Sequence, residues 1–334
     1  MNQIRSAGID VSAKKLVVSY QATPQSKVHT WEVANTAQGH LQLCRKLQQT
    51  SSPLQVCLEA TGNYSLDVAV ALHQHGISVM VLNPRAAKDF ARALQNRSKT
   101  DVVDSLALLT YVQRMEFRPW QPPRQALLQL RDISRRIKAL TKQGAQEKNR
   151  LEAATACQGL SPVVKQDIQA HLSYLEGRIR KLLQHACQLI EQSSELRPIC
   201  QQLTSIKGIA VTSATHLMAE LLLLPEDMTA KQWVAQAGLD PRHHESGSSI
   251  QKPVRISRAG NPLLRDSLFM PALSAVRFEP HIKAFYEKLI SRGKTPMQAL
   301  VAVMRKLLHS IHGMLKSGEC FQGQKFFALE PPTP

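Results

Sequence analysis

The chain has 334 residues, of which 43 % are hydrophobic and 5 % aromatic, which is typical of a globular protein and excludes a disordered one. Lysine and arginine number 42 against 25 aspartates and glutamates, a formal net charge of +17. Because such a surplus costs self-repulsion, it predicts a polyanionic partner, nucleic acid before membrane. No apolar run reaches the length of a membrane span and no signal sequence precedes the first strand, so we expect a cytoplasmic protein.

The cysteine residues also predict a cytoplasmic protein. The six cysteines show no C-x-x-C spacing, so we expect reduced residues and no zinc site. They are Cys44, Cys57, Cys157, Cys187, Cys200 and Cys320.

The first hundred residues alternate between strand and helix patterns. A hairpin is expected first, and the elements after it should form one mixed sheet flanked by helices. A further helix should begin at Ser98 or Thr100, either of which is a suitable N-cap. The elements expected before it are the hairpin 4–20, strand 27–33, helix 37–49, strand 54–59, helix 64–75, strand 77–82 and a helix from Pro84.

Four acidic residues fall at the ends of these elements. Asp10 closes the first strand, Glu59 closes the fourth, and Asp101 and Asp104 lie one helical turn apart on the same face. Strand ends in open α/β sheets gather at one edge, where ligands bind, and converging carboxylates are costly without a cation. Magnesium suits such oxygen ligands. Taken singly, each acid is equally consistent with a solvated turn or helix start.

Basic residues accompany these acids. Arg85, Lys88 and Arg92 share one face of the expected helix, and Arg97 and Lys99 precede Asp101. They form either a track for phosphates or an ordinary solvated face.

A long helical hairpin is expected next. Prolines at 119–123 end the first domain, and residues 118–150 then hold nine lysines and arginines against two acids. We expect this first arm to face nucleic acid through Arg131, Arg135 and Lys138. The second arm, with apolar residues spaced by four and three over 168–189, has a coiled-coil seam that should pack against a partner. The alternative is a hairpin that only links domains.

The segment 203–222 is similar to a helix-hairpin-helix. Its turn centres on Lys207 and Gly208, and the backbone N–H groups at the start of the second helix suit a phosphate. A purely structural turn explains the same residues.

Residues 237–249 form a polar segment expected to be a loop, and Ser246 lies within it. A basic run follows, and Asn261-Pro262 then opens a helix as N-cap and first-turn proline. The segment 266–317 should also be helical. Candidate phosphate contacts in this region are Lys252, Arg255, Arg258 and Arg265.

Two sets of motifs resemble one known family. Gly8-Ile9-Asp10, Glu59-Ala60-Thr61-Gly62 and the run from Lys99 to Ser105 are similar to the DEDD motifs of RuvC-like transposases. The segments 237–247 and 255–265 resemble the AGLxP…SG…IS(R/K)xGN…LR pattern of the same proteins. The family is insertion-sequence family one-hundred-and-ten, which includes the Piv-type DNA invertases.

The resemblance implies a fold and a division into domains. The fold class would be α/β plus α, with an RNase H-like (RuvC-like) mixed sheet, a helical hairpin or coiled coil and a mostly helical C-terminal transposase domain. The domains would span 1–118, 119–198 and 199–325, followed by a tail at 326–334.

The resemblance also implies a chemistry. Asp10, Glu59, Asp101 and Asp104 would hold two Mg²⁺ ions, and Ser246 would attack the scissile phosphate to give a transient phosphoserine. Ser248 and Ser249 are alternative positions for the nucleophile.

The partners implied are donor and target DNA, a structured bridge RNA that guides the enzyme, and further copies of the chain. The homo-oligomer would be a dimer or tetramer with a site completed between subunits, acting at the bacterial nucleoid. Two other functions fit the residues: a metal-dependent junction-resolving nuclease in which water attacks, and a DNA-binding architectural protein without activity.

Overall fold

The computed structural model describes residues 4–49, 52–62, 64–95, 100–156, 161–246 and 250–329, with the backbone alone at 243–246 and 250–253. The chain divides into two compact units, Met1–Pro122 and Pro123–Pro334. Each unit is described by itself.

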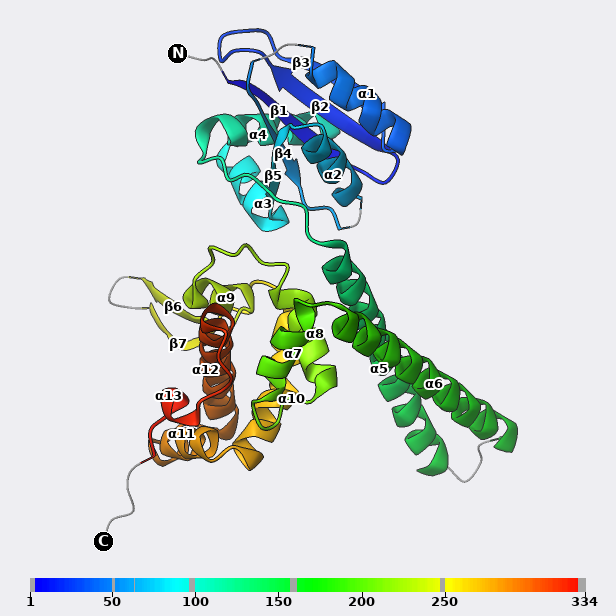
Figure 1. Cartoon of the computed structure of the whole chain (residues 1–334), viewed down its shortest axis with the longest axis vertical. Helices are drawn as coiled ribbons and strands as arrows, with labels where there is room; N and C mark the ends of the chain where they lie inside the picture. The colour runs from blue at the N-terminus through cyan, green and yellow to red at the C-terminus, as the bar shows by residue number, and fades with distance from the viewer. Residues whose placement is uncertain are drawn as a thin grey trace. The chain divides into compact units, whose positions relative to one another are not determined.

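The first unit is built on a five-stranded sheet with the order β3-β2-β1-β4-β5 (Figure 1). The first three strands form an antiparallel meander, and β4 and β5 run parallel to β1. This is the strand order of an RNase H-like fold, so the predicted fold class is confirmed. The strands are β1 (Arg5–Val11), β2 (Lys15–Gln21), β3 (His29–Ala34), β4 (Leu54–Glu59) and β5 (Ser78–Leu82).

Helices cover both faces of this sheet. One core lies between the sheet and the apolar sides of α1 and α2. A smaller one joins the opposite face to α3 and α4. Both faces of the central strands are therefore buried, as their apolar sequences require. The helices are α1 (Ala37–Leu47), α2 (Leu66–Gln74), α3 (Pro84–Ala93) and α4 (Asp101–Arg114).

The second unit begins with the predicted helical hairpin, formed by α5 (Gln125–Ala156) and α6 (Pro162–Gln192). The buried residues of α6 include Leu172, Leu175 and Ala186, and α6 packs along α5 of the same chain. Other residues of the seam, Ile168, Ile179, Leu182 and Leu189, are only partly buried by this pairing, so packing of α6 against a partner stays a prediction.

The rest of the second unit is mostly helical around one large core. Asn261 caps α10 by accepting hydrogen bonds from the N–H groups of Leu263 and Leu264, as its sequence predicts. The helices are α7 (Leu196–Thr204), α8 (Val211–Leu221), α9 (Ala230–Gln236), α10 (Pro262–Phe278), α11 (Pro280–Ser291), α12 (Pro296–Ser317) and α13 (Gly323–Phe326). No helix among the described residues is long and apolar enough to span a membrane.

The expected loop at 237–249 is largely wrong. The backbone forms an antiparallel hairpin of β6 (Pro241–Ser246) and β7 (Ile250–Ile256). The sequence of β6 has no alternation of apolar residues, and that of β7 has only Ile250, Val254 and Ile256, so the pattern did not reveal the ribbon.

Candidate functional site

A glycine fixes the position of α4 on the sheet. At Gly8, in the middle of β1, a Cβ atom would lie 2.2 Å from both the Ser105 carbonyl oxygen and the Leu109 nitrogen. The helix backbone therefore rests directly on the strand, and no side chain fits between them. A buried hydrogen bond of 2.8 Å between the hydroxyls of Ser105 and Ser19 ties the same turn to β2.

This packing brings the start of α4 to the edge where β1 and β4 end. Of the two predicted caps, Thr100 is the N-cap: its Oγ1 accepts a hydrogen bond from the Val103 N–H at 3.2 Å. Asp101 and Asp104 occupy the first turn of the helix. The parallel register of Ile9 with Leu58 places Asp10 and Glu59 as the next residues of adjacent strands.

The charges of Glu59, Asp101 and Asp104 act on the carboxyl group of Asp10. Burial raises the pKa of Asp10 to about 6, assisted by the charges of Asp101, Asp104 and Glu59. The structure thus gathers the four predicted acids, here called the acidic tetrad, at one edge of the sheet. Within the part of the chain that the structure describes, no group of three or more His, Cys, Asp or Glu side chains is placed so that it could hold a metal ion. The oxygen donors and the excess negative charge nevertheless fit a hard divalent cation.

Lys15, which sequence reasoning missed, lies beside the tetrad at the start of β2. Its ammonium is 2.8 Å from Glu32 Oε1 and 3.0 Å from Asp101 Oδ2. Hydrogen bonds to Glu32 and Asp101 raise the pKa of Lys15. The only sequence signal was its place at the start of the second strand of the hairpin, directly after the tight turn.

The predicted basic face of α3 is exposed but partly neutralised. Asp89 lies 3.6 Å from Arg85 and 3.9 Å from Arg92, and Lys88 is exposed on the same helix. Its role as a phosphate track stays a prediction. Arg97 and Lys99 lie outside the described residues.

Comparisons with known proteins place the chain in a family. Residues 7–155 match a family model described as a transposase of the DEDD type, and residues 200–287 match the model "Transposase IS116/IS110/IS902 family". The chain is 31 % identical over 302 residues to the pilin gene-inverting protein of Moraxella bovis, covering 88 % of this chain and 91 % of that protein. The chain belongs to the IS110 family of transposases. It is therefore an enzyme of the transposase and DNA-recombinase class.

Other similarities are more partial. This IS110-family chain is 29 % identical over 130 residues to an uncharacterized 43.6 kDa protein of insertion element IS110 from Streptomyces coelicolor, covering 39 % of this chain and 32 % of that protein. The solved structure of T. thermophilus RuvC with a Holliday junction substrate matches 35 % of this chain and all of RuvC, at 18 % identity and a TM-score of 0.27.

The serine motif of the IS110-family chain lies on the β6–β7 hairpin. The backbone of Ser246, the last residue of β6, pairs with that of Ile250 on β7. The side chains of Ser246 and Lys252, and the residues Ser248 and Ser249, lie outside what the structure describes. The choice of nucleophile among the three serines therefore stays a prediction.

The segment that follows β7 is tightly held by the turn after α9. Arg258 has a positive φ of 52°, which is unusual for a residue with a side chain, and its N–H donates to the Gly238 carbonyl at 3.1 Å. A Cβ atom on Gly260 would lie 2.3 Å from the Gln236 carbonyl oxygen. Gly260 thus serves close packing, and Arg258 lies on an exposed, constrained turn.

Arg255 and Arg265 differ in their surroundings. Arg255 is exposed on β7, where its backbone pairs with Arg242. Arg265 instead donates from Nη1 to the Ala237 carbonyl at 3.0 Å, so it braces the turn after α9. Arg255 and Arg258 are therefore more exposed than Arg265.

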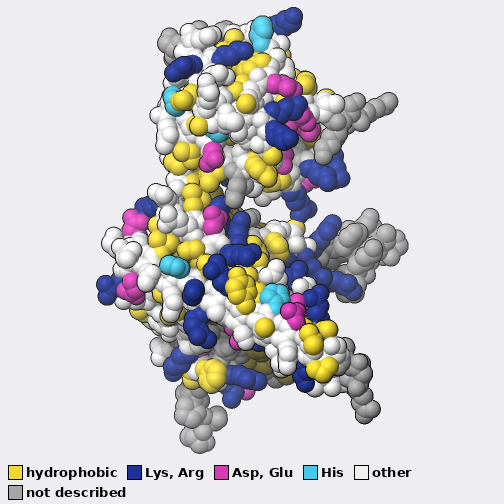
Figure 2. Space-filling model, turned by 90° about the vertical axis from the view of Figure 1, so that its right-hand side faces the viewer, with side chains coloured by type: hydrophobic (Ala, Val, Ile, Leu, Met, Phe, Trp, Pro, Cys, Tyr) yellow, Lys and Arg dark blue, Asp and Glu magenta, His cyan; other side chains and the backbone are white. Residues whose placement is uncertain are grey.

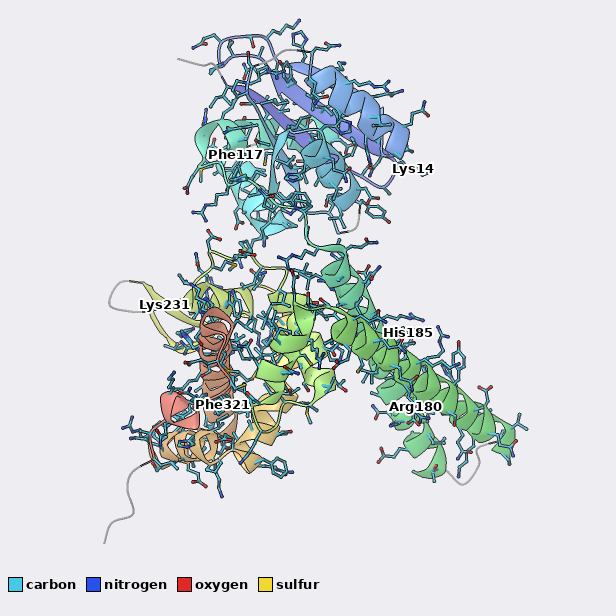
Figure 3. The ribbon with its side chains drawn as sticks, viewed as in Figure 1. Lys14, Phe117, Arg180, His185, Lys231 and Phe321 are labelled. Atoms are coloured by element: carbon cyan, nitrogen blue, oxygen red, sulfur yellow. The ribbon has the colours of Figure 1, made fainter. Side chains whose placement is uncertain are left out.

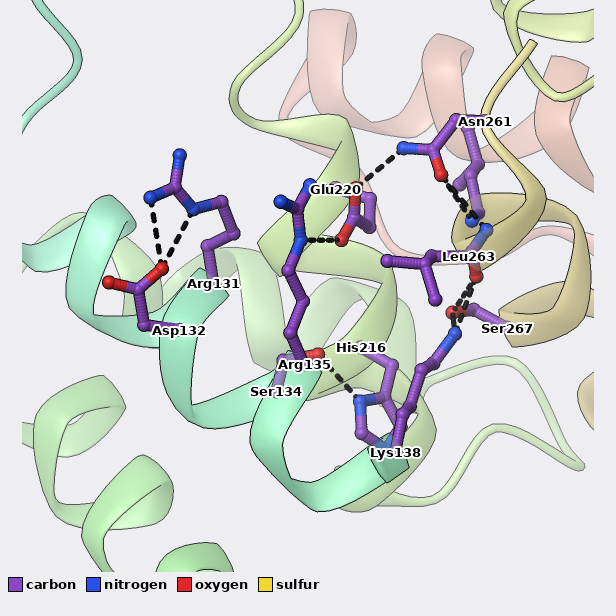
Figure 4. Close-up of polar contacts among 11 residues, drawn as sticks. Arg131, Asp132, Ser134, Arg135, Lys138, His216, Glu220, Asn261, Leu263 and Ser267 are labelled. Carbon is purple, nitrogen blue, oxygen red and sulfur yellow. Dashed lines mark hydrogen bonds and ion pairs between the residues drawn. The ribbon is translucent and has the colours of Figure 1, made fainter. Parts of the chain in front are cut away.

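The predicted nucleic-acid contacts on α5 have partners within the chain (Figure 4). Arg131 pairs with Asp132 at 2.9 Å, and Arg135 forms a two-pronged pair with Glu220 at 3.0 and 3.1 Å. Lys138 donates to the Leu263 carbonyl at 2.5 Å and to the Ser267 hydroxyl at 2.6 Å. Arg135 and Lys138 therefore hold α5 to the helical core, a role that the expectation of a free basic arm did not include.

Basic side chains are nevertheless plentiful on the surface of the hairpin. Figure 2 shows Lys and Arg side chains spread over this face of the molecule. In Figure 3, Arg180 and His185 project from α6. Both are exposed.

The turn of the helix-hairpin-helix-like element is packed on one side. Gly208 has a φ of 107°, and a Cβ there would lie 2.5 Å from the Ala275 nitrogen of α10. Close approach of α10 therefore explains the glycine, as the structural alternative predicts. Lys207 is exposed. A phosphate contact at Lys207 and Gly208 stays a prediction.

The sequence analysis missed two polar residues of α8, of which Glu220 is buried and His216 is partly buried. Glu220 is buried in the pair with Arg135, and His216 Nδ1 lies 2.7 Å from the Ser134 hydroxyl. Burial, followed by the charge of Lys138, lowers the pKa of His216 to about 4. The available signal was the presence of a histidine and an acid within an otherwise apolar helix.

Proposed function

We propose that this IS110-family protein is an RNA-guided DNA recombinase that cleaves and rejoins DNA through a serine nucleophile. The observation that carries the proposal is the gathering of Asp10, Glu59, Asp101 and Asp104 at one sheet edge. A half-buried acid whose pKa is raised by desolvation and further by three other carboxylates is costly, and such an arrangement is typical of functional sites.

The acidic tetrad would hold Mg²⁺, and we propose two ions per site. When bound, the metal supplies charge stabilisation to the phosphate under attack. The protein contributes the rigid placement of these acids, through the Gly8 contact of α4 with β1 and the parallel pairing of β1 with β4.

Ser246 would carry the covalent step. Its Oγ forms a bond to phosphorus, the bond from phosphorus to the leaving deoxyribose oxygen breaks, and that oxygen takes up a proton as the serine hydroxyl loses one. The product is a phosphoserine ester and a free DNA hydroxyl. Attack by a hydroxyl of the exchanged strand reverses the step and releases Ser246, so no bond energy is lost to water.

The partners follow from the charge and the family. A net charge of +17 suits donor DNA, target DNA and a structured bridge RNA together. We propose that the chain works as a dimer or tetramer, with the tetrad of one subunit and the serine of another acting on the same phosphate.

A suicide substrate tests the chemistry. The full-length protein is incubated with bridge RNA, Mg²⁺ and a nicked DNA that loses its leaving strand, and the covalent adduct is mapped by mass spectrometry. Ser246→Ala should abolish the adduct, whereas Ser248→Ala and Ser249→Ala should retain it. Cleavage that persists in Ser246→Ala would indicate attack by water, and DNA binding without cleavage by the wild-type protein would indicate an architectural role.

The tetrad needs its own variant. Asp101→Asn should lose most of the chemistry and bind Mn²⁺ more weakly, but keep its DNA affinity, because basic side chains supply the phosphate contacts. Loss of DNA affinity together with folding would instead assign the tetrad a structural role.

A further inference from the structure

A buried carboxylate in the second unit has two partners from different elements. The Glu220 side chain on α8 is 3 % exposed. It accepts two hydrogen bonds from the Arg135 guanidinium of α5 and one from Asn261 Nδ2 at 2.5 Å (Figure 4). Glu220 is therefore the point at which α5, α8 and the start of α10 meet.

The bond to Asn261 determines which way that amide faces. An ionised carboxylate only accepts hydrogen bonds, so the Asn261 NH₂ group must point to Glu220. Its oxygen then faces α10, where it accepts from the N–H groups of Leu263 at 2.9 Å and Leu264 at 3.2 Å. A single orientation of one side chain thus satisfies Glu220 and caps the helix.

Asn261 is in turn the end of the segment that carries Arg258. The Asn261 N–H donates to the Gln236 carbonyl at 2.6 Å, and Gly260 and Arg258 both have positive φ angles. Glycine adopts such an angle freely, but at Arg258 it is strained and persists only where its surroundings fix it. This segment continues directly from β7, the strand whose partner ends in Ser246.

A role in stability alone does not account for this arrangement. Burying an ion pair costs desolvation energy that its attraction only just recovers, so an apolar cluster of the same volume would serve stability as well. What an apolar cluster cannot do is orient an amide and hold a strained turn in one place.

We propose that Glu220 is a positioning residue for strand transfer: it fixes Asn261, and through it the turn bearing Arg258 and the base of the β6–β7 hairpin. This inference rests on the proposed function of Ser246. Arg135 links the same point to the basic helical hairpin, so the placement of the turn depends on α5.

The test uses the full-length protein with Glu220→Gln, an almost isosteric change that removes the charge. Glu226→Gln, an exposed position beyond α8, is the matched control. The double variant E220Q/N261D restores a donor and an acceptor with their roles exchanged, and aspartate is also a good N-cap. Three quantities are measured: the rate of adduct formation on suicide DNA, the DNA Kd, and native tryptic cleavage after Arg258 relative to cleavage after Arg292.

We expect E220Q to form the adduct about tenfold more slowly or worse, since small misplacements are costly in catalysis. Its DNA Kd should stay within roughly twofold of the wild type, because the exposed basic residues are unchanged. The Arg258 cleavage ratio should rise severalfold, and the double variant should recover both the rate and the ratio. Glu226→Gln should behave as the wild type.

An adduct rate for E220Q equal to that of the wild type overturns the proposal, as does a fall in rate matched by an equal loss of DNA affinity. An unchanged Arg258 cleavage ratio also overturns it. If the wild-type protein forms no adduct, the Ser246 proposal fails, and the cleavage ratio alone then decides whether Glu220 holds the turn.

Discussion

The ammonium of Lys15 lies 3.0 Å from Asp101 Oδ2, so one acid of the tetrad has a protein cation beside it. The same ammonium contacts Glu32 Oε1 at 2.8 Å on the neighbouring strand. Lys15 therefore offsets part of the negative charge that gathers at this edge of the sheet. A divalent cation at the tetrad would have to share Asp101 with it.

Lys15→Gln should bind Mn²⁺ more tightly than the wild type. Removing a nearby positive charge lowers the repulsion that an incoming cation meets, and the Kd should fall by roughly fivefold at most, because exposed pairs of this kind interact weakly. Paramagnetic resonance of free Mn²⁺ measures the affinity. Lys14→Gln is the control, because Lys14 projects from the turn before β2 (Figure 3) and is exposed. Equal affinities for the two variants would show that Lys15 does not compete for the site.

Asp10→Asn should stabilise the metal-free protein at neutral pH. The pKa of Asp10 is raised from 3.8 to about 6, so the folded state binds the proton more tightly and loses stability as pH rises through this interval. The variant avoids that loss, worth about 2 kcal/mol after allowance for solvent. Urea unfolding in EDTA at pH 7.5 should show the gain, and it should vanish below pH 3.8. A variant less stable at pH 7.5 would contradict the prediction.

Gly8→Ala should strongly destabilise the first unit. The added methyl would overlap the backbone of α4 at Ser105 and Leu109, and moving a helix off its sheet costs about 3 kcal/mol or more. Gly144→Ala on α5 is the matched control: nothing lies within 4 Å of the added Cβ, and alanine favours a helix by about 1 kcal/mol. Thermal unfolding compares the two. Wild-type stability in Gly8→Ala would mean that α4 is not seated on β1 as described.

The tetrad's placement could be predicted because it depends on local rules. Asp10 and Glu59 end apolar strands, and Asp101 follows a helix cap, so the position of each could be predicted from the adjacent residues. Parallel strands then bring their ends to one edge whatever the details of packing. Lys15 lay beyond such reasoning, because its contact with Asp101 depends on how α4 crosses the sheet.

In the second unit, the partners of the basic residues could not be predicted from the sequence, for a physical reason. A lysine or arginine on an amphipathic helix has the same local pattern whether it faces solvent or a hydrogen-bond acceptor on another helix. Arg135 and Lys138 belong to the second case, and their partners Glu220 and Leu263 are more than eighty residues away in sequence. The β6–β7 hairpin could not be predicted either, since pairing between backbone groups requires no particular pattern of side chains in a largely polar sequence.

His216 gives a pH dependence to the stability of the second unit. Its pKa is lowered from 6.5 to about 4, so the unfolded chain binds the proton more readily and stability falls as pH drops from 6.5 toward 4. The loss is about 3 kcal/mol at most. His216→Asn, whose amide can still meet Ser134, should lack this component, so the difference between the two unfolding curves isolates it from other titrating groups. Parallel curves between pH 7 and pH 4 would show that His216 is not held neutral beside Lys138.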